Sequence, residues 1–582
     1  MRRTFRVVLL KPSHYDDTGY VIRWMRACIP SNTLACLYTI TEGVQRSGRL
    51  GPDVDLRMDV YDESNQRIPV DQIIRELTAP DAEGVVCLAG VQSNQYPRAI
   101  DLARRFKAAG IATLIGGFHV SGCLSMLETL PDDLTSAMEE GITLVAGEVE
   151  ERWGDILEDA LHHRLKPLYN FLKELPNLQG QALPILPREV VSRYVGTLTT
   201  FDAGRGCPFE CSFCTIINVQ GRKSRSRSAD DIEAIIRENH RRGITRYFIT
   251  DDDFARNKHW ESIFDRMILL RERDRIKISF TLQVDTASHR LPRFIEKAGK
   301  AGCTKVFIGM ESVNAEALKE TGKKQNHVDE YREMLQAWRK SKVVTYAGYI
   351  IGFPNDTYES VMRDVALMKK ELPLDLVEFF VLTPLPGSED HQILVKKGAW
   401  LEPDMNQYDT EHPCSKHPKM SHEEWMRTYR DAWKSFYTLE HVETIFRRRW
   451  AEGHSIGKVL GPVLWFWGAF FIEGVHPLQA GILRRKHRSE RRPTLKQKQE
   501  SLLRFTVSRA WETATTLARA AGLFWKLTRL RRRVEQDPAA ASYRDVAITP
   551  VERKRGGLRV LPAETAFALK QESAPAEPAP LS

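Results

Sequence analysis

Short apolar runs alternate with amphipathic helical segments along the first 400 of the 582 residues, and this alternation limits the folds open to the chain. In the first 165 residues, helical segments such as PRAIDLARRFKAAG (97–110) separate five candidate strands. These strands are FRVVLL (5–10), VDLRMDVY (54–61), GVVCLAG (84–90), IATLIGG (111–117) and ITLVAGE (142–148). Strands that alternate with helices predict a parallel sheet covered by helices on both faces.

Five such strands fit an N-terminal flavodoxin-like, doubly wound domain, in which ligands bind at the carboxyl ends of the strands. A second alternating series follows LTTFDAG, and six strands in one series predict a central partial (β/α)6 barrel rather than a closed barrel of eight. The other five strands of this series are RYFITDD (246–252), ISFTLQVD (278–285), KVFIGME (305–311), TYAGYIIGFP (345–354) and LVEFFVLTPLPG (376–387). The overall fold class is therefore α/β.

Breaks in these patterns suggest the domain boundaries. We expect a first domain over 1–165, a proline-containing linker over 166–192 and the core over 193–400. A mostly helical C-terminal region is predicted over 401–560, including a long basic amphipathic helix at 502–533, and a Pro/Ala/Glu-rich, disordered tail over 561–582.

Composition narrows the class of protein. Nine cysteines in 582 residues, six of them scattered, do not form a secreted disulfide framework, so a reducing cytoplasm is expected. The longest uncharged stretch, 459–472, is shorter than the roughly 20 residues of a membrane-spanning helix. The net charge of +9 is concentrated in C-terminal basic runs. Such runs suit an anionic surface, although a solvated face is the more common explanation.

Three cysteines lie within the twelve residues GRGCPFECSFCT (204–215), spaced C-x₃-C-x₂-C at Cys207, Cys211 and Cys214. Structural zinc sites use four ligands, often as two separated pairs, and this sequence has no second CxxC. Three thiolates from one loop can instead hold three irons of a [4Fe-4S] cluster and leave the fourth iron for another ligand. Gly204 and Gly206 would allow the loop to wrap closely. These cysteines are the predicted metal and catalytic site.

The cysteine motif, directly after the first strand of the second series, resembles the signature of the radical S-adenosylmethionine (SAM) superfamily, and the resemblance spans about residues 195–400. It implies that SAM binds the open iron and is cleaved to a 5′-deoxyadenosyl radical. It also implies that the strand ends hold SAM, with YIIGFP (349–354) on the adenine side. The implied SAM-binding residues are Phe213, Asp251, Asp252, Asp253, Gln283 and Glu311.

The N-terminal domain resembles the cobalamin-binding domains of the same superfamily through GVQSNQYPRAIDLAR, GGFHVSG and AGEVE. The implied cobalamin-binding residues are Ser93, Asn94, Gly116, Gly117, His119, Gly147 and Glu148. The D-x-H-x-x-G motif of some cobalamin proteins is absent, and the nearest stretch, SHYDDTG (13–19), has the wrong spacing. The axial ligand of the cobalt therefore stays open, as does a degenerate domain that binds no corrin.

Together these resemblances imply a cobalamin-dependent methyltransferase that adds a methyl group to an unactivated carbon of a small-molecule or lipid-like substrate. The alternatives are oxidative ring closure without methyl transfer and a non-catalytic cobalamin or redox sensor. A flavodoxin- or ferredoxin-type electron donor is expected, and no nucleic acid. Aromatic residues beside arginines after residue 455 suit either peripheral contact with the inner membrane face or a helical subdomain packed over the barrel.

Overall fold

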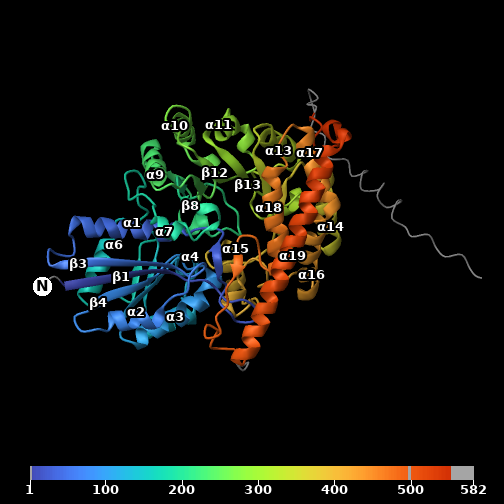
Figure 1. Cartoon of the computed structure of the whole chain (residues 1–582). Coiled ribbons are helices and arrows are strands. Elements are labelled where there is room, and N and C mark those ends of the chain that lie inside the picture. Colours follow the sequence, from blue (N-terminus) through green and yellow to red (C-terminus); the bar gives the residue numbers. More distant parts are fainter. Residues whose placement is uncertain (1–2, 496–499, 552–582) are drawn as a thin grey trace, which may run out of the picture.

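The computed structural model describes residues 3–495 and 500–551, so the predicted tail over 561–582 and the last nine residues of the predicted helical region lie outside the described residues. Two parallel sheets with covering helices form the first two thirds of the chain, and a helical region packs beside the second sheet (Figure 1). The predicted α/β class with a mostly helical C-terminal region is therefore confirmed.

The N-terminal sheet is parallel, with the strand order β3-β1-β4-β5-β6-β7. Its first five strands in sequence have the flavodoxin-like order 2-1-3-4-5. Their bounds are β1 (Arg3–Lys11), β3 (Val54–Asp62), β4 (Glu83–Leu88), β5 (Ala112–Gly116) and β6 (Thr143–Ala146). The sixth strand, β7 (Leu168–Asn170), and the short helix α7 (Arg188–Val191) occupy the segment expected as a linker. Part of that segment thus completes the first sheet.

Helices cover both faces of this sheet because its strands are apolar on both sides. α1 (Asn32–Ser47) and α6 (Trp153–Leu161) bury leucines, isoleucines and a tryptophan against one face. α2 (Val70–Leu77), α3 (Tyr96–Ala108), α4 (Phe118–Met126) and α5 (Asp132–Glu139) cover the other. Figure 1 shows these two helical layers on either side of the blue strands.

The second sheet is also parallel, and its strands follow one another in chain order: β8, β11, β12, β13, β14 and β15. Their bounds are Leu198–Phe201, Arg246–Ile249, Ser279–Val284, Cys303–Glu311, Val344–Ile351 and Leu376–Val381. β8 and β15 are the two edges. This is the strand order expected of a six-stranded partial barrel, and the barrel curvature itself stays a prediction.

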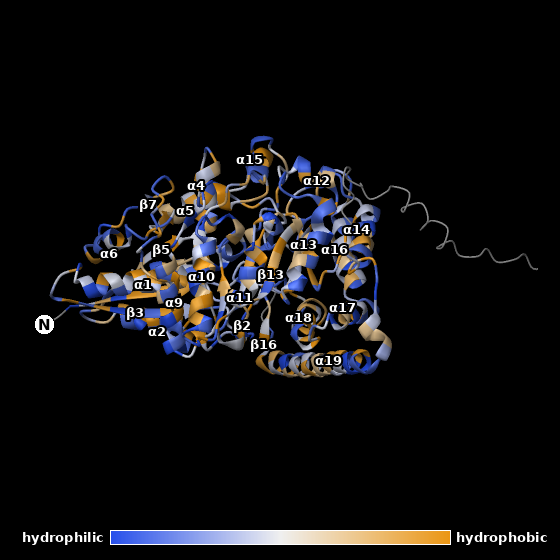
Figure 2. Cartoon of the chain, turned by 90° about the horizontal axis from the view of Figure 1, so that it is seen from above, coloured by the Kyte–Doolittle hydropathy of each residue, from blue (hydrophilic) through white to orange (hydrophobic). Residues whose placement is uncertain are grey.

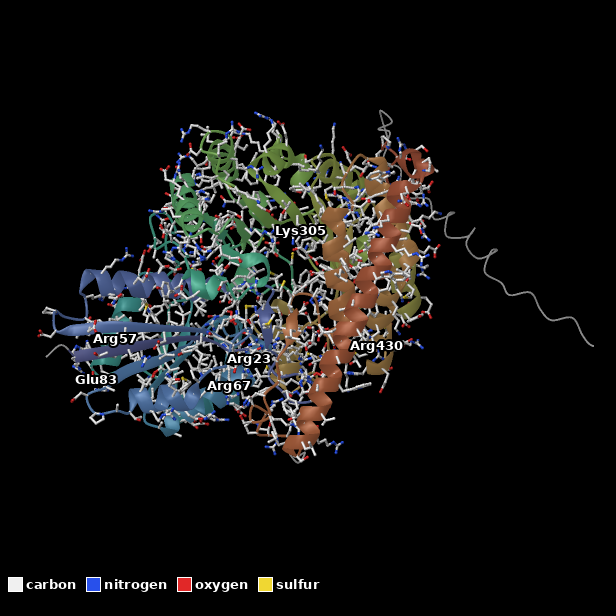
Figure 3. The ribbon with its side chains drawn as sticks, viewed as in Figure 1. Arg23, Arg57, Arg67, Glu83, Lys305 and Arg430 are labelled. Atoms are coloured by element: carbon white, nitrogen blue, oxygen red, sulfur yellow. The ribbon has the colours of Figure 1, made fainter. Side chains whose placement is uncertain are left out.

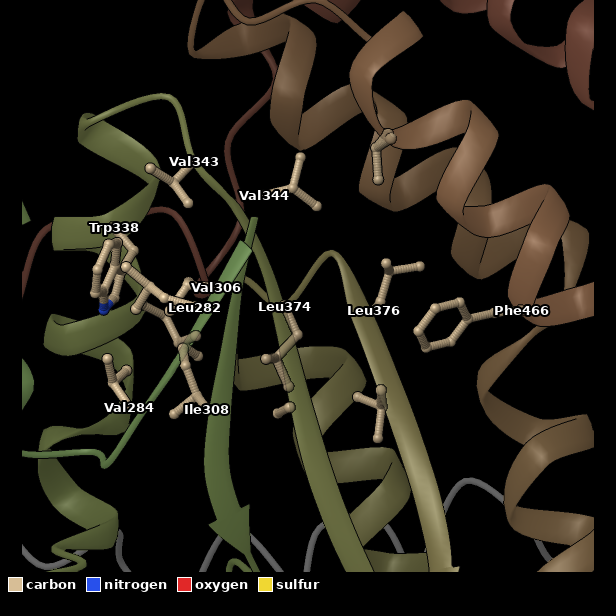
Figure 4. Packing of buried hydrophobic residues seen from close by; sticks show 14 of the residues in the cluster. Leu282, Val284, Val306, Ile308, Trp338, Val343, Val344, Leu374, Leu376 and Phe466 are labelled. Carbon is tan, nitrogen blue, oxygen red and sulfur yellow. The ribbon is translucent and has the colours of Figure 1, made fainter. Parts of the chain in front are cut away.

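The helices of this second series are α9 (Ala229–Arg241), α10 (Trp260–Glu272), α11 (Phe294–Ala301), α13 (Tyr331–Lys340) and α14 (Tyr358–Glu371). The N-cap of α9 is Ser228, whose hydroxyl accepts a hydrogen bond from the Asp231 amide. Figure 4 shows how Trp338 of α13 packs on Leu282 and Val306 of the sheet. This core fixes the strand ends at which a ligand would bind.

The C-terminal region contains α16 (His422–Phe436), α17 (Leu439–Ala451), α18 (Gly457–Gly468) and the 35-residue α19 (Leu502–Gln536). Phe466 of α18 packs on Leu376 of β15 (Figure 4). Between α18 and α19 the chain returns to the N-terminal domain, where β16 (Gly481–Arg484) pairs antiparallel with β2 (Trp24–Ala27). Glu490 accepts hydrogen bonds from Arg23 and Arg67, which Figure 3 labels side by side. The C-terminal region thus contacts both the second sheet and the N-terminal domain.

Candidate functional site

A two-residue antiparallel ribbon closes the cysteine loop at its base, where β9 (Gly204–Arg205) pairs with β10 (Arg225–Ser226). The Cys207 amide donates to the Gly221 carbonyl oxygen at 3.2 Å. Gly206 has a φ of +85°, and a Cβ there would lie 2.6 Å from the Lys223 oxygen. Only glycine fits this close approach of two backbone segments, so the sequence itself shapes the loop.

All three cysteines of the motif are free thiols on this loop. Burial raises the pKa of both Cys207 and Cys214 to about 12, so these thiols stay neutral unless a cation compensates the thiolate charge. Iron supplies that charge, and the all-sulfur donor set fits an iron–sulfur cluster. Within the described residues, no three His, Cys, Asp or Glu side chains converge closely enough to hold a single metal ion.

Cys211 is the most buried of the three and has two polar neighbours. The Gln325 amide donates to its sulfur at 3.8 Å. Burial raises the pKa of Cys211, and the ammonium of Lys323 opposes that rise. Lys323 also forms an ion pair with Glu311 and lies 5.7 Å from the centre of the Phe213 ring. The structure therefore brings two predicted site residues, Phe213 and Glu311, to the cysteine loop.

Glu311 ends β13 in a strained conformation. Its φ is +62°, and the register between β13 and β14 shifts at this point. Such a backbone is uncommon for a residue other than glycine and persists only where its surroundings hold it. Phe213 packs at 6.3 Å from Phe353, which belongs to the predicted adenine-side segment. Strand ends β13 and β14 thus meet the loop at one place.

The three aspartates after β11 face different surroundings. Asp251 accepts a hydrogen bond from the Ala203 amide at 2.7 Å, and Asp253 accepts from the Asp285 amide at 3.3 Å. Both therefore tie neighbouring strand ends together. Asp252 instead lines the central cavity, and burial raises its pKa to about 7. Gln283 donates to the Asp251 main-chain oxygen at 3.2 Å, a link between strands β12 and β11.

A central cavity of about 600 Å³ lies between the two sheets and the C-terminal region. Ser93 and Asn94, after β4, line it on the N-terminal side. Asp252 and Thr215, the residue after Cys214, line it on the side of the second sheet. The predicted cobalamin and SAM regions therefore border one space.

A smaller cleft of about 160 Å³ adjoins this cavity, and Arg205 lines both. Four predicted cobalamin-binding residues, Gly116, Gly117, Gly147 and Glu148, line the cleft. Gly116 ends β5, and the other three follow β5 or β6, at the carboxyl ends where this fold binds ligands. Apolar side chains such as Leu37, Ile40 and Leu114 make up much of the rest of its wall.

The histidines of the two segments considered for cobalamin, GGFHVSG and SHYDDTG, lie in different surroundings. His119 is buried, with its ring 4.3 Å from the Tyr96 ring and its Nδ1 3.3 Å from the Ser93 hydroxyl. His14, from the SHYDDTG stretch, lines the central cavity and lies 3.0 Å from the Gln479 side-chain oxygen. Its position was not expected from the sequence.

A buried ion network joins the N-terminal domain to the cysteine loop. The Arg205 guanidinium lies 2.6 Å from Glu148, 2.5 Å from Glu150 and 3.0 Å from Asp202. Burial alone would raise the pKa of Asp202, but Arg205 and Arg227 lower it to about 2. The sequence shows Arg205 and Glu148 beside two separate motifs, and it carries no signal that they pair.

The C-terminal region supplies part of the cavity wall, which sequence reasoning missed. Tyr408, Asp409, His476 and Gln479 line the cavity opposite the strand ends. His476 is 1% exposed, its ring packs 4.7 Å from the Phe380 ring, and burial lowers its pKa to about 4. No spacing pattern marks such residues, since they lie in turns between helices.

Comparison with known proteins agrees with this geometry. Residues 202–368 match the model of the radical SAM superfamily. The chain is 27% identical over 342 residues to bacteriochlorophyllide d C-12(1)-methyltransferase of Chlorobaculum tepidum, covering 56% of this chain and 68% of that protein.

Two solved structures share the fold. The radical SAM methyltransferase TsrM from Kitasatospora setae, solved with cobalamin and a [4Fe-4S] cluster, gives a TM-score of 0.54 at 15% identity, over 75% of this chain and 91% of that one. The cobalamin-dependent radical SAM enzyme OxsB, solved with aqua-cobalamin, gives a TM-score of 0.50 at 13% identity, over 93% of this chain and 82% of that one. A radical SAM domain uses a [4Fe-4S] cluster and SAM. The chain is therefore an enzyme with a radical SAM domain over residues 202–368, and it shares the fold of these two solved structures.

Proposed function

We propose that this enzyme is a cobalamin-dependent methyltransferase that adds a methyl group to an unactivated carbon. The observation that carries the proposal is the single cavity of about 600 Å³ bordered by both strand-end regions. In this proposal the cluster and SAM supply a carbon radical on the substrate, and cobalamin supplies the methyl group. A relative that methylates bacteriochlorophyllide supports this reaction class.

The residues that bracket the cavity have distinct tasks in this proposal. Cys207, Cys211 and Cys214 hold the cluster, and Phe213 and Glu311 bound the SAM site beside it. Asp252, Asp251, Asp253 and Gln283 complete that site, with Asp252 facing the cavity. Ser93 and Asn94 face the corrin, and the cleft lined by Gly116, Gly117, Gly147 and Glu148 takes its nucleotide tail, with His119 packed behind.

The cavity wall favours a largely apolar substrate with a few polar groups. Ile22, Trp24, Phe380 and Leu478 contribute apolar surface. Asp409, His476 and Gln479 offer hydrogen-bond partners on the C-terminal side. Apolar walls that exclude water suit radical chemistry, because water weakens electrostatic interactions in the site and allows side reactions of reactive intermediates. We therefore propose a ring-containing small molecule or lipid-like compound as the substrate class.

We further propose a cytoplasmic protein reduced by a flavodoxin- or ferredoxin-type donor and in peripheral contact with the inner membrane face. Oxidative ring closure without methyl transfer uses the same residues and is kept as the alternative outcome of the test. A non-catalytic sensor would leave SAM intact.

The test begins with anaerobic reconstitution of the full chain with iron, sulfide and hydroxocobalamin. Reduced wild-type enzyme should cleave SAM to 5′-deoxyadenosine and bind the corrin. Cys211→Ala should lose iron and cleavage but keep corrin uptake. Cys303→Ala is the matched control, since Cys303 is also buried but begins β13, at the end of the strand opposite to Glu311. Zinc binding in place of iron, or intact SAM, would refute the proposal.

Methyl transfer itself is measured with SAM that carries a trideuteromethyl group, incubated with an extract of hydrophobic metabolites. A labelled product supports methylation. An unlabelled product that has lost hydrogen supports ring closure instead.

A further inference from the structure

A row of large apolar side chains lies exposed along α19. Leu503 is 77% exposed, Trp511 73% and Trp525 60%, and Val507 and Leu517 are also more than half exposed. At 100° per residue these five positions fall within about 120° of the helix circumference. An apolar face of this size on a soluble surface marks a contact with something outside the chain.

α19 lies at the outer edge of the molecule, so this face is accessible. Figure 1 shows α19 at the front, and in Figure 2 it runs along one border of the molecule, beyond α17 and α18. The opposite side of α19 packs on those two helices through Leu523, Leu527 and Leu530, which are buried. The aromatic segment before it behaves differently. Trp465, Phe470 and their neighbours pack against the core, which favours a helical subdomain there.

The charge of α19 indicates what covers its apolar face. Between Leu502 and Val534 the helix has eight basic residues and one acidic residue, Glu512. Arg504, Lys526 and Arg532 are exposed on or beside the apolar face. A second copy of the chain would bring like charges together at this surface. An anionic lipid headgroup layer instead complements the arginines and accepts the apolar side chains just beneath.

The geometry suits a helix in the plane of the interface. α19 is about 50 Å long at 1.5 Å per residue. Its tryptophans at 511 and 525 are of the residue type enriched at the headgroup level. No helix among residues 3–495 and 500–551 is long and apolar enough to cross a bilayer.

An apolar groove beside α19 shares one lining residue with the central cavity. It has a volume of about 270 Å³ and lies between α18 and α19, with Leu464, Ile472 and Leu517 in its walls. Ala480 lines both this groove and the central cavity. A membrane against α19 would therefore lie next to the wall of the proposed active site.

We propose that the face of α19 formed by Leu503, Val507, Trp511, Leu517 and Trp525 docks on an anionic membrane. This inference rests on the proposed function in one respect: it assigns the proposed peripheral membrane contact to a surface of α19. Membrane binding through that surface does not require SAM, the cluster or the corrin. The basic residues draw the protein to the surface, and the apolar residues hold it there.

The test is co-sedimentation of the full chain with vesicles of phosphatidylcholine alone or with about 30 mole percent phosphatidylglycerol. Wild type should bind the anionic vesicles, with weaker binding at high salt because exposed charges are screened. Leu503→Glu/Trp511→Glu should weaken binding by at least about tenfold, since two apolar anchors become charged. Arg504→Gln/Lys526→Gln should reduce the preference for anionic lipid.

Leu269→Glu on α10 is the matched control, because Leu269 is 46% exposed on another face, and it should bind as wild type. Unchanged circular dichroism and melting would show that the variants fold. The proposal is overturned if wild type stays in the supernatant with anionic vesicles, or if the α19 variants bind equally well. A dimer that Leu503→Glu/Trp511→Glu dissociates, without vesicle binding, would assign the face to a second copy. SAM cleavage is measured separately, so failure here leaves the proposed reaction standing.

Discussion

Arg205→Met tests whether the buried ion network holds the corrin-side domain against the cysteine loop. The side chains of Arg205 and Glu150 are 9% and 4% exposed, and among the described residues Glu150 pairs with Arg205 and no second cation. Removal of one partner of a buried pair typically costs about 3–5 kcal/mol, because the other charge stays buried. Glu148 keeps Arg225 and Asp202 keeps Arg227, so we expect the lower end, about 3 kcal/mol.

Urea unfolding of the apo protein, followed by tryptophan fluorescence, measures this loss. Arg205→Met/Glu150→Gln should recover part of the loss, since the carboxylate that Arg205 neutralises is then absent. Arg49→Met is the control. Its ion pair with Asp155 is 39% and 47% exposed and should contribute less than about 1 kcal/mol. If Arg205→Met unfolds like Arg49→Met, or if the double variant shows no coupling, the network does not stabilise the interface.

Two further predictions concern packing and pH. Gly117 has a φ of +146°, and a Cβ there would lie 2.2 Å from the Val91 nitrogen, so Gly117→Ala should lower the free energy of unfolding by about 2–4 kcal/mol and reduce corrin uptake. Gly110→Ala is the control, because the space around Gly110 is open, and it should cost about 1 kcal/mol. Equal losses for the two variants in urea unfolding would contradict this prediction. Burial lowers the pKa of His14 and His476 to about 4. Between about pH 6.5 and 4 the unfolded chain therefore binds more protons than the folded chain. The contribution of each histidine to the free energy of unfolding is complete above pH 6.5, and about 2 kcal/mol of it is lost by pH 5. His14→Gln should flatten the plot of melting temperature against pH, and an unchanged slope would refute the assignment.

Local sequence patterns predicted most of the elements. The five candidate strands of the first 165 residues are β1, β3, β4, β5 and β6, and the basic helix at 502–533 is α19. β7 was missed because it lies among prolines and has three residues. β2 and β16 were missed because each has four residues, and their partners lie more than 450 residues apart in sequence.

The candidate site divides in the same way. The cysteines and the glycines of GGFHVSG are local motifs, so the sequence alone locates them. The Arg205 network and the cavity wall around His476 depend on which distant segments meet, and that is set by topology rather than spacing. Asp251 and Asp253 look equivalent to Asp252 in sequence, yet they hold strand ends and only Asp252 faces the cavity.

The pairing of β16 with β2 has a consequence for biosynthesis. The Trp24 indole nitrogen donates to the Gln479 oxygen across 455 positions of sequence. A ribosome must therefore translate the chain past residue 484 before this side of the central cavity can close. Until then both parallel sheets can fold while the chamber between them stays open to bulk solvent.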